Sequence, residues 1–223
     1  MNLEILECKQ GSPEWYAARL GLPTASEFKT VIGIKKDAKE KITRQIYMRK
    51  LAGEIITGQP AEDYTNEHMQ RGSAQEEEAR EFYAFTRAAE LRRVGFIRNG
   101  RAGCSPDSLI GEDGGLEIKC ALAHIQIDRL LKGELPPEHR AQVQGSLWLT
   151  GRAYWDFVSY CPRLPLFVIR VKREDGFIAE LAGAVAQFNT ELADMVERIR
   201  SYGEARSSSS LMEKLKASAE AAQ

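Results

Sequence analysis

Residues 104–120 read CSPDSLIGEDGGLEIKC, and this stretch decides the predicted fold. Its central GEDGG is typical of a turn, so we expect the segments on either side to pair as a β-hairpin. Side chains two positions apart on a strand share a face, so Glu117 and Lys119 should project together while Ile118 enters a core. A hairpin of this length can bring Asp107 beside Glu117.

Two carboxylates and an ammonium in this arrangement indicate metal-dependent hydrolysis of nucleic acid. Carboxylates held within a few Å repel each other unless a cation lies between them, and all-oxygen ligation suits Mg²⁺ or Mn²⁺ rather than zinc. A lysine beside them can orient an attacking water and offset the charge of a phosphorane-like transition state. An Asp and a Glu-x-Lys also occur by chance as solvated strand charges, so the hairpin alone leaves both interpretations open.

Further segments surround the hairpin in a specific order. They are Trp15-Tyr16-Ala17-Ala18-Arg19-Leu20-Gly21, Thr24-Ala25-Ser26, Arg71-Gly72 with Glu76, and Ala141-Gln142-Val143-Gln144. From about Trp15 to Arg163 the chain resembles the phage lambda exonuclease family of recombination nucleases. The resemblance implies an α/β fold: a restriction-endonuclease-like PD-(D/E)xK core with a mixed central sheet flanked by helices, and an N-terminal helical region.

The resemblance also assigns roles to residues of this sequence. The implied catalytic set is Glu76, Asp107, Glu117, Lys119 and Gln142. The implied metal ligands are Asp107, Glu117, Glu76 and the backbone carbonyl of Ile118. The expected cofactor is Mg²⁺, with Mn²⁺ as the alternative and two ions per site. One ion would help to form the nucleophile and the other would steady the leaving oxygen.

Contacts with DNA are expected at three further places. The resemblance suggests that Arg19 and Ser26 bind a terminal 5′-phosphate and that Met69 is an apolar wedge that splits the terminal base pair. The basic run that begins with Lys35 and Lys36 is a candidate for contacts to the DNA backbone. A solvated helix of mixed charge is the competing interpretation of that run.

Each assigned side chain also has an ordinary structural interpretation. Glu76 begins a run of three glutamates that would usually form a solvated helical face. Gln142 could be a surface amide, Arg19 a surface cation and Met69 a core methionine. Ser26 could cap a helix, although free amides at a helix start also bind phosphate.

The composition agrees with one globular domain, since 43% of the 223 residues are hydrophobic and 28% are charged. The net charge of −1 is compatible with DNA binding if basic groups are clustered. The four cysteines form no Cys-x-x-Cys pair, which argues against a zinc ribbon, a disulfide framework or an iron–sulfur cluster. The three histidines are dispersed, and no Gly-x-x-x-x-Gly-Lys loop for ATP is present.

The sequence also predicts where the protein resides and how it is divided. With no signal peptide or membrane-spanning segment, we expect it in the cytoplasm of a bacterial cell, encoded by a phage or prophage. Residues 1–203 should form one nuclease domain, helical over about 1–90 and with its catalytic core over about 91–203. Residues 204–223, which include the serine run at 207–210, should be a flexible tail.

The hydrophobic pattern and the turn residues predict the elements. Helices are expected over 13–20, 25–32, 39–57, 66–86, 123–132, 137–150 and 174–202. Strands are expected over 94–98, 108–110, 116–120, 153–161 and 166–172.

The resemblance implies a 5′-to-3′ exonuclease that digests linear double-stranded DNA to mononucleotides and leaves 3′ overhangs. It further implies a ring-shaped homotrimer around DNA and a single-strand annealing protein as partner. Two alternatives remain open from the sequence: a structure- or site-specific endonuclease of the same fold, such as a junction resolvase, and a non-catalytic DNA-binding protein. The presence of the whole catalytic set disfavours the latter.

Overall fold

The computed structural model describes residues 3–33, 38–61 and 67–220, with the side chains of 67–74 and 203–220 left out of the description. Its central sheet has the strand order β2-β5-β6-β7-β8. These strands are β2 (Leu91–Arg92), β5 (Ser108–Ile110), β6 (Gly114–Cys120), β7 (Tyr154–Tyr160) and β8 (Phe167–Lys172). Strands β6 and β7 are parallel and the other neighbours antiparallel, so the mixed central sheet of the predicted fold is confirmed.

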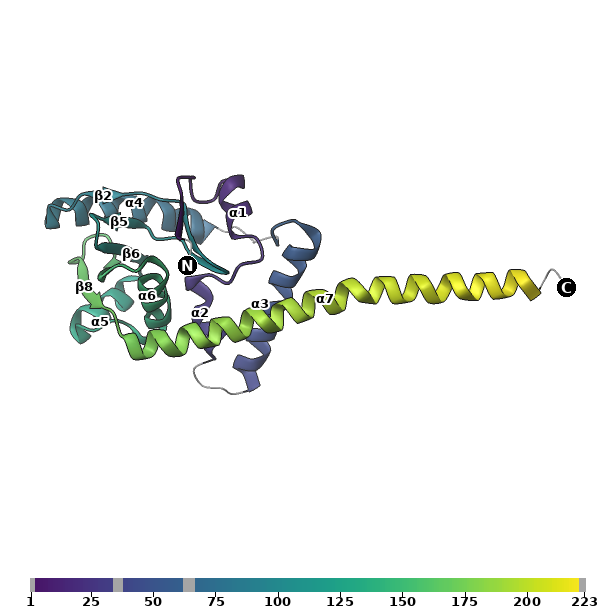
Figure 1. The fold of residues 1–223 in the computed structure, drawn as a ribbon. Coiled ribbons are helices and arrows are strands. Elements are labelled where there is room, and N and C mark those ends of the chain that lie inside the picture. Colours follow the sequence, from purple (N-terminus) through teal and green to yellow (C-terminus); the bar gives the residue numbers. More distant parts are fainter. Residues whose placement is uncertain (1–2, 34–37, 62–66, 221–223) are drawn as a thin grey trace.

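Helices cover both faces of this sheet (Figure 1). The connection from β6 to the parallel strand β7 contains α5 (Ala123–Lys132) and α6 (Pro137–Thr150), as a parallel pair requires a long crossover. Helix α6 packs on one face of the sheet, and α4 (Glu67–Arg87) packs against β6 and β7 from the other.

The alternation of side chains along the strands divides the core in two. Ile118 and Val158 belong to the hydrophobic cluster beneath α4. Trp155 and Phe157, one position out of phase, belong to the larger cluster that includes Leu147 of α6. Glu117 and Lys119 therefore emerge on the α6 face, as the two-residue period of a strand predicts.

A second sheet has the order β1-β3-β4 and lies between the N-terminus and the β5–β6 hairpin along the chain. Its strands are β1 (Leu3–Leu6), β3 (Phe96–Asn99) and β4 (Ala102–Cys104). The sequence predicted a strand at 94–98 but neither β1 nor β4, and β2 was also missed. These strands have four residues or fewer, which is too short for a clear alternation of polar and apolar side chains.

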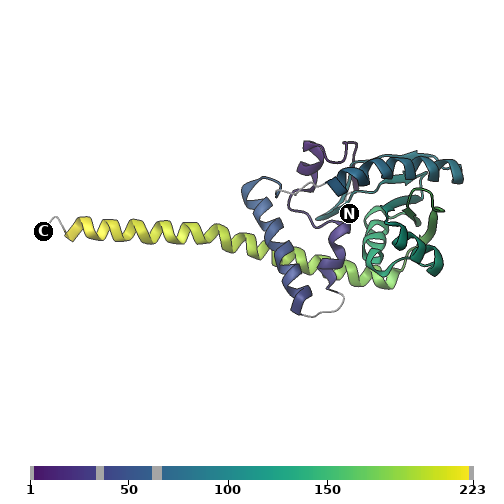
Figure 2. The same cartoon turned by 180° about the vertical axis from the view of Figure 1, so that it is seen from behind.

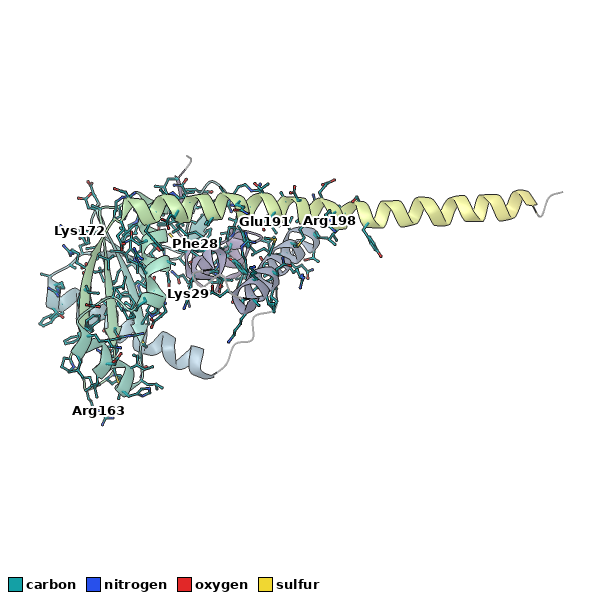
Figure 3. The ribbon with its side chains drawn as sticks, turned by 90° about the horizontal axis from the view of Figure 1, so that it is seen from below. Phe28, Lys29, Arg163, Lys172, Glu191 and Arg198 are labelled. Atoms are coloured by element: carbon teal, nitrogen blue, oxygen red, sulfur yellow. The ribbon has the colours of Figure 1, made fainter. Side chains whose placement is uncertain are left out.

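Most of the remaining helices pack against one another or against α6. They are α1 (Pro13–Arg19), the 3₁₀ turn η1 (Ala25–Glu27), α2 (Phe28–Ile32), α3 (Ala38–Thr57) and α7 (Asp175–Glu220). A single helix had been expected over 25–32. Phe28 is fully buried where α7 passes over α2 and α3 (Figure 3), and Gly145 lies so close to its ring that a Cβ there would be 2.3 Å away. Helix α6 can therefore approach η1 and α2 closely.

Helix α7 continues to Glu220 and projects well beyond the body of the molecule (Figure 1, Figure 2). The predicted helix end near Tyr202 is therefore wrong. Serine is less favourable than alanine in a helix by only a fraction of a kcal/mol, and extending a formed helix is easier than starting one. The flexibility of residues 204–223 and the division of the domain stay predictions. Within the described ranges, no helix combines the length and apolar character that crossing a bilayer requires.

Candidate active site

The β5–β6 hairpin places Asp107 beside Glu117. Ser108 lies opposite Leu116 in the antiparallel register, and the backbone N–H of Asp107 donates to the carbonyl of Leu116 at 3.1 Å. The Oδ2 atom of Asp107 accepts the backbone N–H of Ile118 at 2.5 Å. The hairpin thus fixes the Asp107 carboxylate against strand β6.

Glu117 is the centre of a hydrogen-bonded group on the α6 face. Glu117 is only 3% exposed. Its Oε1 atom accepts hydrogen bonds from Lys119 Nζ at 2.6 Å and from Gln142 Nε2 at 2.5 Å. Gln142 reaches it from α6, across the crossover connection. A buried carboxylate is tolerated because both of these donors stabilise its charge.

Glu76 approaches from α4 and lines the same cleft as Asp107. The pKa of Asp107 is raised well above its ordinary value by burial first, and then by the negative charges of Glu117 and Glu76. The negative charges of Glu117 and Glu76 therefore add to burial in disfavouring the ionised form of Asp107. The Glu76 carboxylate also accepts a hydrogen bond from Arg80 at 2.6 Å, so the glutamate run is not simply a solvated face.

Lys119 stays protonated in this setting. Burial by itself would lower its pKa, but the charges of Glu117 and Asp107 and the hydrogen bond to Glu117 outweigh burial, and the pKa is raised. Lys119 is therefore a fixed ammonium beside the carboxylates.

The donor set fits a hard divalent cation. Asp107, Glu117 and Glu76 offer oxygen ligands alone, and a cation would offset both the burial and the neighbouring negative charge that raise the pKa of Asp107. Across the side chains that the structure describes, however, no three of the acidic, histidine and cysteine groups already stand in the geometry of a metal cage. The predicted roles of Glu76, Ile118 and the other ligands stay predictions.

A second cleft lies between α1, η1 and α3 and contains Arg19. Its lining also includes Trp15, Thr24, Tyr47 and Lys50. The Arg19 guanidinium lies 4.0 Å from the centroid of the Trp15 ring. Two cations and several hydroxyls suit an anion, although carboxylates of the same cleft, such as that of Glu27, oppose it.

Trp15 connects this cleft to the hairpin. Its indole Nε1 donates to Ser105 Oγ at 2.9 Å and to the carbonyl of Gly95 at 3.1 Å. Ser105 precedes Asp107 by two positions, so Trp15 contacts both Arg19 and the segment that carries Asp107.

Ser26 is exposed, and its hydroxyl lies 3.1 Å from that of Thr24. It is not among the residues that line the Arg19 cleft, whereas Thr24 is. The alternative role as a helix cap is wrong, because Ser26 lies within η1 and Thr24 occupies the N-cap position. The phosphate-binding role of Ser26 stays a prediction.

The other predicted DNA contacts are only partly visible. Lys35 and Lys36 lie outside the described residues, as does the side chain of Met69. Further along the basic run, Arg44 forms an ion pair with Glu191 of α7 at 2.6 Å, so that arginine holds two helices together.

Several residues of the two clefts were not identified from the sequence. Gln10 Nε2 donates to the carbonyls of Pro106 at 2.9 Å and Val94 at 3.3 Å, and it thereby supports the segment that carries Asp107. No local pattern marks a contact that spans 96 positions. Arg80 could have been found, because an acidic residue four positions before an arginine is a usual helical pair.

The comparisons with known proteins agree with the resemblance. Residues 14–153 match the YqaJ-like viral recombinase domain family. The solved structure of LHK-Exo, an alkaline exonuclease from Laribacter hongkongensis, is 35% identical with a TM-score of 0.78, and the match covers 87% of this chain and 99% of that chain. The complex of LHK-Exo with dAMP gives 36% identity and a TM-score of 0.79 over the same shares.

The structure of a phage-related exonuclease from Haemophilus somnus 129PT is 17% identical, with a TM-score of 0.60, and the match covers 80% of this chain and 96% of that chain. At this identity the likeness supports only a shared fold. A search of curated protein sequences gave no significant match. The match to the family profile extends over more than half of the chain and includes the α4 glutamate, the hairpin and Gln142. The resemblance to the phage lambda exonuclease family is thereby confirmed, and the chain belongs to the YqaJ-like viral recombinase domain family.

Proposed function

We propose that this protein is a metal-dependent 5′-to-3′ exonuclease that degrades linear double-stranded DNA to mononucleotides and leaves 3′ overhangs. The observation that carries the proposal is the convergence of Asp107, Glu117 and Glu76, with Lys119 bonded to Glu117. The similarity to an alkaline exonuclease whose complex with dAMP has been solved supports a nucleotide product.

The chain's own groups divide the work of phosphodiester hydrolysis. Divalent cations, Mg²⁺ or Mn²⁺ and two per site, would supply positive charge to the phosphate and lower the pKa of water. Asp107, Glu117 and Glu76 would hold them. The N–H and C=O groups of one residue in a strand point toward the same edge of that strand, and the N–H of Ile118 is hydrogen-bonded to Asp107. Its carbonyl therefore faces the same side and can serve as a further ligand.

Lys119 and Gln142 act on the reaction in different ways. The Lys119 ammonium would orient the attacking water and stabilise negative charge as it grows on the phosphate oxygens. Gln142 would fix the rotation of the Glu117 side chain through its 2.5 Å hydrogen bond. In-line attack would then displace the 3′ oxygen of the departing nucleotide.

Recognition of an end would come from the Arg19 cleft. A 5′-phosphate suits a guanidinium that is already fixed on the Trp15 ring, because less side-chain freedom is lost on binding. Trp15 also donates a hydrogen bond to Ser105, so the residue that orients Arg19 is connected to the segment that carries Asp107. Digestion would accordingly start at a phosphorylated 5′ terminus.

We also propose that three copies form a ring around the DNA and that a single-strand annealing protein binds the overhang. Both follow the phage lambda exonuclease family. Helix α5 offers an apolar surface for association, since Leu131 is 82% exposed and Ile127 is 46% exposed. Light scattering should give the mass of three 25.0 kDa chains, and a stable monomer would contradict the ring.

The deciding experiment incubates linear and covalently closed plasmid with Mg²⁺, Mn²⁺ or a chelator. We expect loss of the linear form alone, and only with metal. Duplexes labelled at one 5′ or one 3′ end then give the direction, with Asp107→Asn as the inactive control. Cleavage of closed circles would favour an endonuclease, and binding without cleavage would favour a non-catalytic DNA-binding protein.

A further inference from the structure

Arg80 is an almost buried cation at the edge of the active-site cleft. It lies on α4, is 9% exposed, and lines the cleft together with Asp107 and Glu76. Its two terminal nitrogens donate to different carboxylates: Nη2 to Glu76 Oε1 and Nη1 to Glu77 Oε2, both at 2.6 Å. Its Nε atom is buried without a hydrogen-bond partner among the described groups. The guanidinium is thus enclosed rather than reaching for solvent.

The two glutamates that bind Arg80 differ in their other surroundings. On the outer side, Glu77 is also bonded to Arg93, so Arg80 is braced against a second ion pair. On the inner side, the contact with Arg80 uses Oε1 of Glu76. Glu76 and Asp107 line the same cleft, so the Glu76 carboxylate lies on the side of the proposed cation site.

Arg80 could influence a metal ion in two ways, and removing Arg80 would change the metal affinity in opposite directions in the two cases. A cation near the site repels a metal ion, so its removal would strengthen metal binding. A donor that fixes the orientation of a ligand favours binding, so its removal would weaken it by about 10–100-fold. The geometry, in which the buried Arg80 guanidinium is held between Glu77 and Oε1 of Glu76, favours the second effect.

We propose that Arg80 is a positioning residue that orients Glu76 and thereby sets the affinity of the site for divalent cations. The inference rests on the proposed function, because it requires that Glu76 bind the metal. Arg80 would act through Glu76 and not on the reacting atoms themselves.

The test measures binding of Mn²⁺ to the full-length protein by calorimetry without DNA. Arg80→Gln should weaken Mn²⁺ binding about 10–100-fold. Arg92→Gln is the control, because it removes a nearby cation that pairs with Glu7 and not with Glu76 or Glu77 in the described structure, and its side chain is 57% exposed. Its Mn²⁺ affinity should be unchanged or slightly higher.

A double-mutant cycle with Glu76→Gln assigns the effect to the carboxylate. Once Glu76 can no longer bind metal, Arg80→Gln should change the Mn²⁺ affinity less than twofold. Arg80→Lys keeps the charge but cannot hold both glutamates in fixed directions, so it should also weaken binding; this variant carries the test if Arg80→Gln does not fold.

Unchanged or tighter Mn²⁺ binding in Arg80→Gln or Arg80→Lys would overturn the positioning role, as would the same loss in the Glu76→Gln background. Such results would leave the proposed function intact if the wild-type protein still degrades linear DNA with metal. Failure of the wild-type protein to bind Mn²⁺ would instead remove the proposed function together with this inference.

Discussion

Replacing Lys119 with methionine should abolish turnover while leaving DNA binding largely intact. The ammonium lies 2.6 Å from Glu117 Oε1 and its side chain is 34% exposed, so it faces both the carboxylates and the cleft. Loss of one preorganised donor of this kind typically lowers kcat by about 10²–10³, or about 3–4 kcal/mol of transition-state stabilisation. Methionine keeps most of the apolar stem, so little packing is lost.

The assay separates the two steps. Release of nucleotides from a 5′-phosphorylated duplex at saturating DNA gives kcat, and fluorescence anisotropy in Ca²⁺ gives the Kd for DNA. Lys132→Met is the matched control, because Lys132 is 68% exposed and pairs only with Asp128 on α5 in the described structure. A Lys119→Met enzyme within about fivefold of the wild-type kcat would remove the lysine from the mechanism, since the expected loss is at least tenfold larger.

Two further predictions concern end recognition and acid stability. Arg19→Ala should slow digestion of 5′-phosphorylated ends about 10–100-fold, the value of one charge-assisted hydrogen bond, with little effect on 5′-hydroxyl ends. Exposed Arg198→Ala, on α7, is its control, and equal losses on both ends would contradict a phosphate cleft. Burial, with help from Lys119 and Arg129, lowers the pKa of His139 from 6.5 to about 4. Between pH 6.5 and pH 4, His139 is therefore protonated in the unfolded chain but neutral in the folded protein. The free energy of unfolding falls as the pH is lowered through this range, by about 1–2 kcal/mol at pH 5. Urea unfolding at pH 7 and pH 5 should show a smaller acid loss for His139→Gln, and an unchanged loss would refute that role.

The hairpin could be predicted because its determinants are local. The GEDGG turn and the alternation across Glu117, Ile118 and Lys119 set the register without help from distant residues. Ile118 is 4% exposed beneath α4, and Glu117 bonds to Lys119 on the opposite face, as the strand period requires.

The supports of the site could not be predicted because they depend on tertiary contacts. Trp15 reaches Ser105 across 90 positions, and Gln10 reaches Pro106 across 96. Strand β1 has a weak pattern of its own and is ordered by its pairing with β3. Such contacts follow from the folded topology, which a pattern read along the chain does not contain.

Helix α7 illustrates a different difficulty. A serine run predicts a linker from composition, but composition does not state whether a preceding helix has already formed. The first half of α7 packs on α2, α3 and α6, which supplies that preceding helix. The extension to Glu220 is then a matter of propagation.

The central claim is that Asp107 and Glu117 share divalent cations. The most direct measurement is a crystal grown with Mn²⁺, with anomalous difference maps calculated from data at the manganese edge. The account predicts peaks within coordination distance, about 2.0–2.4 Å, of both carboxylates and of the Ile118 carbonyl. Manganese bound elsewhere, or none between these groups in crystals of an enzyme that needs Mn²⁺ for activity, would contradict it.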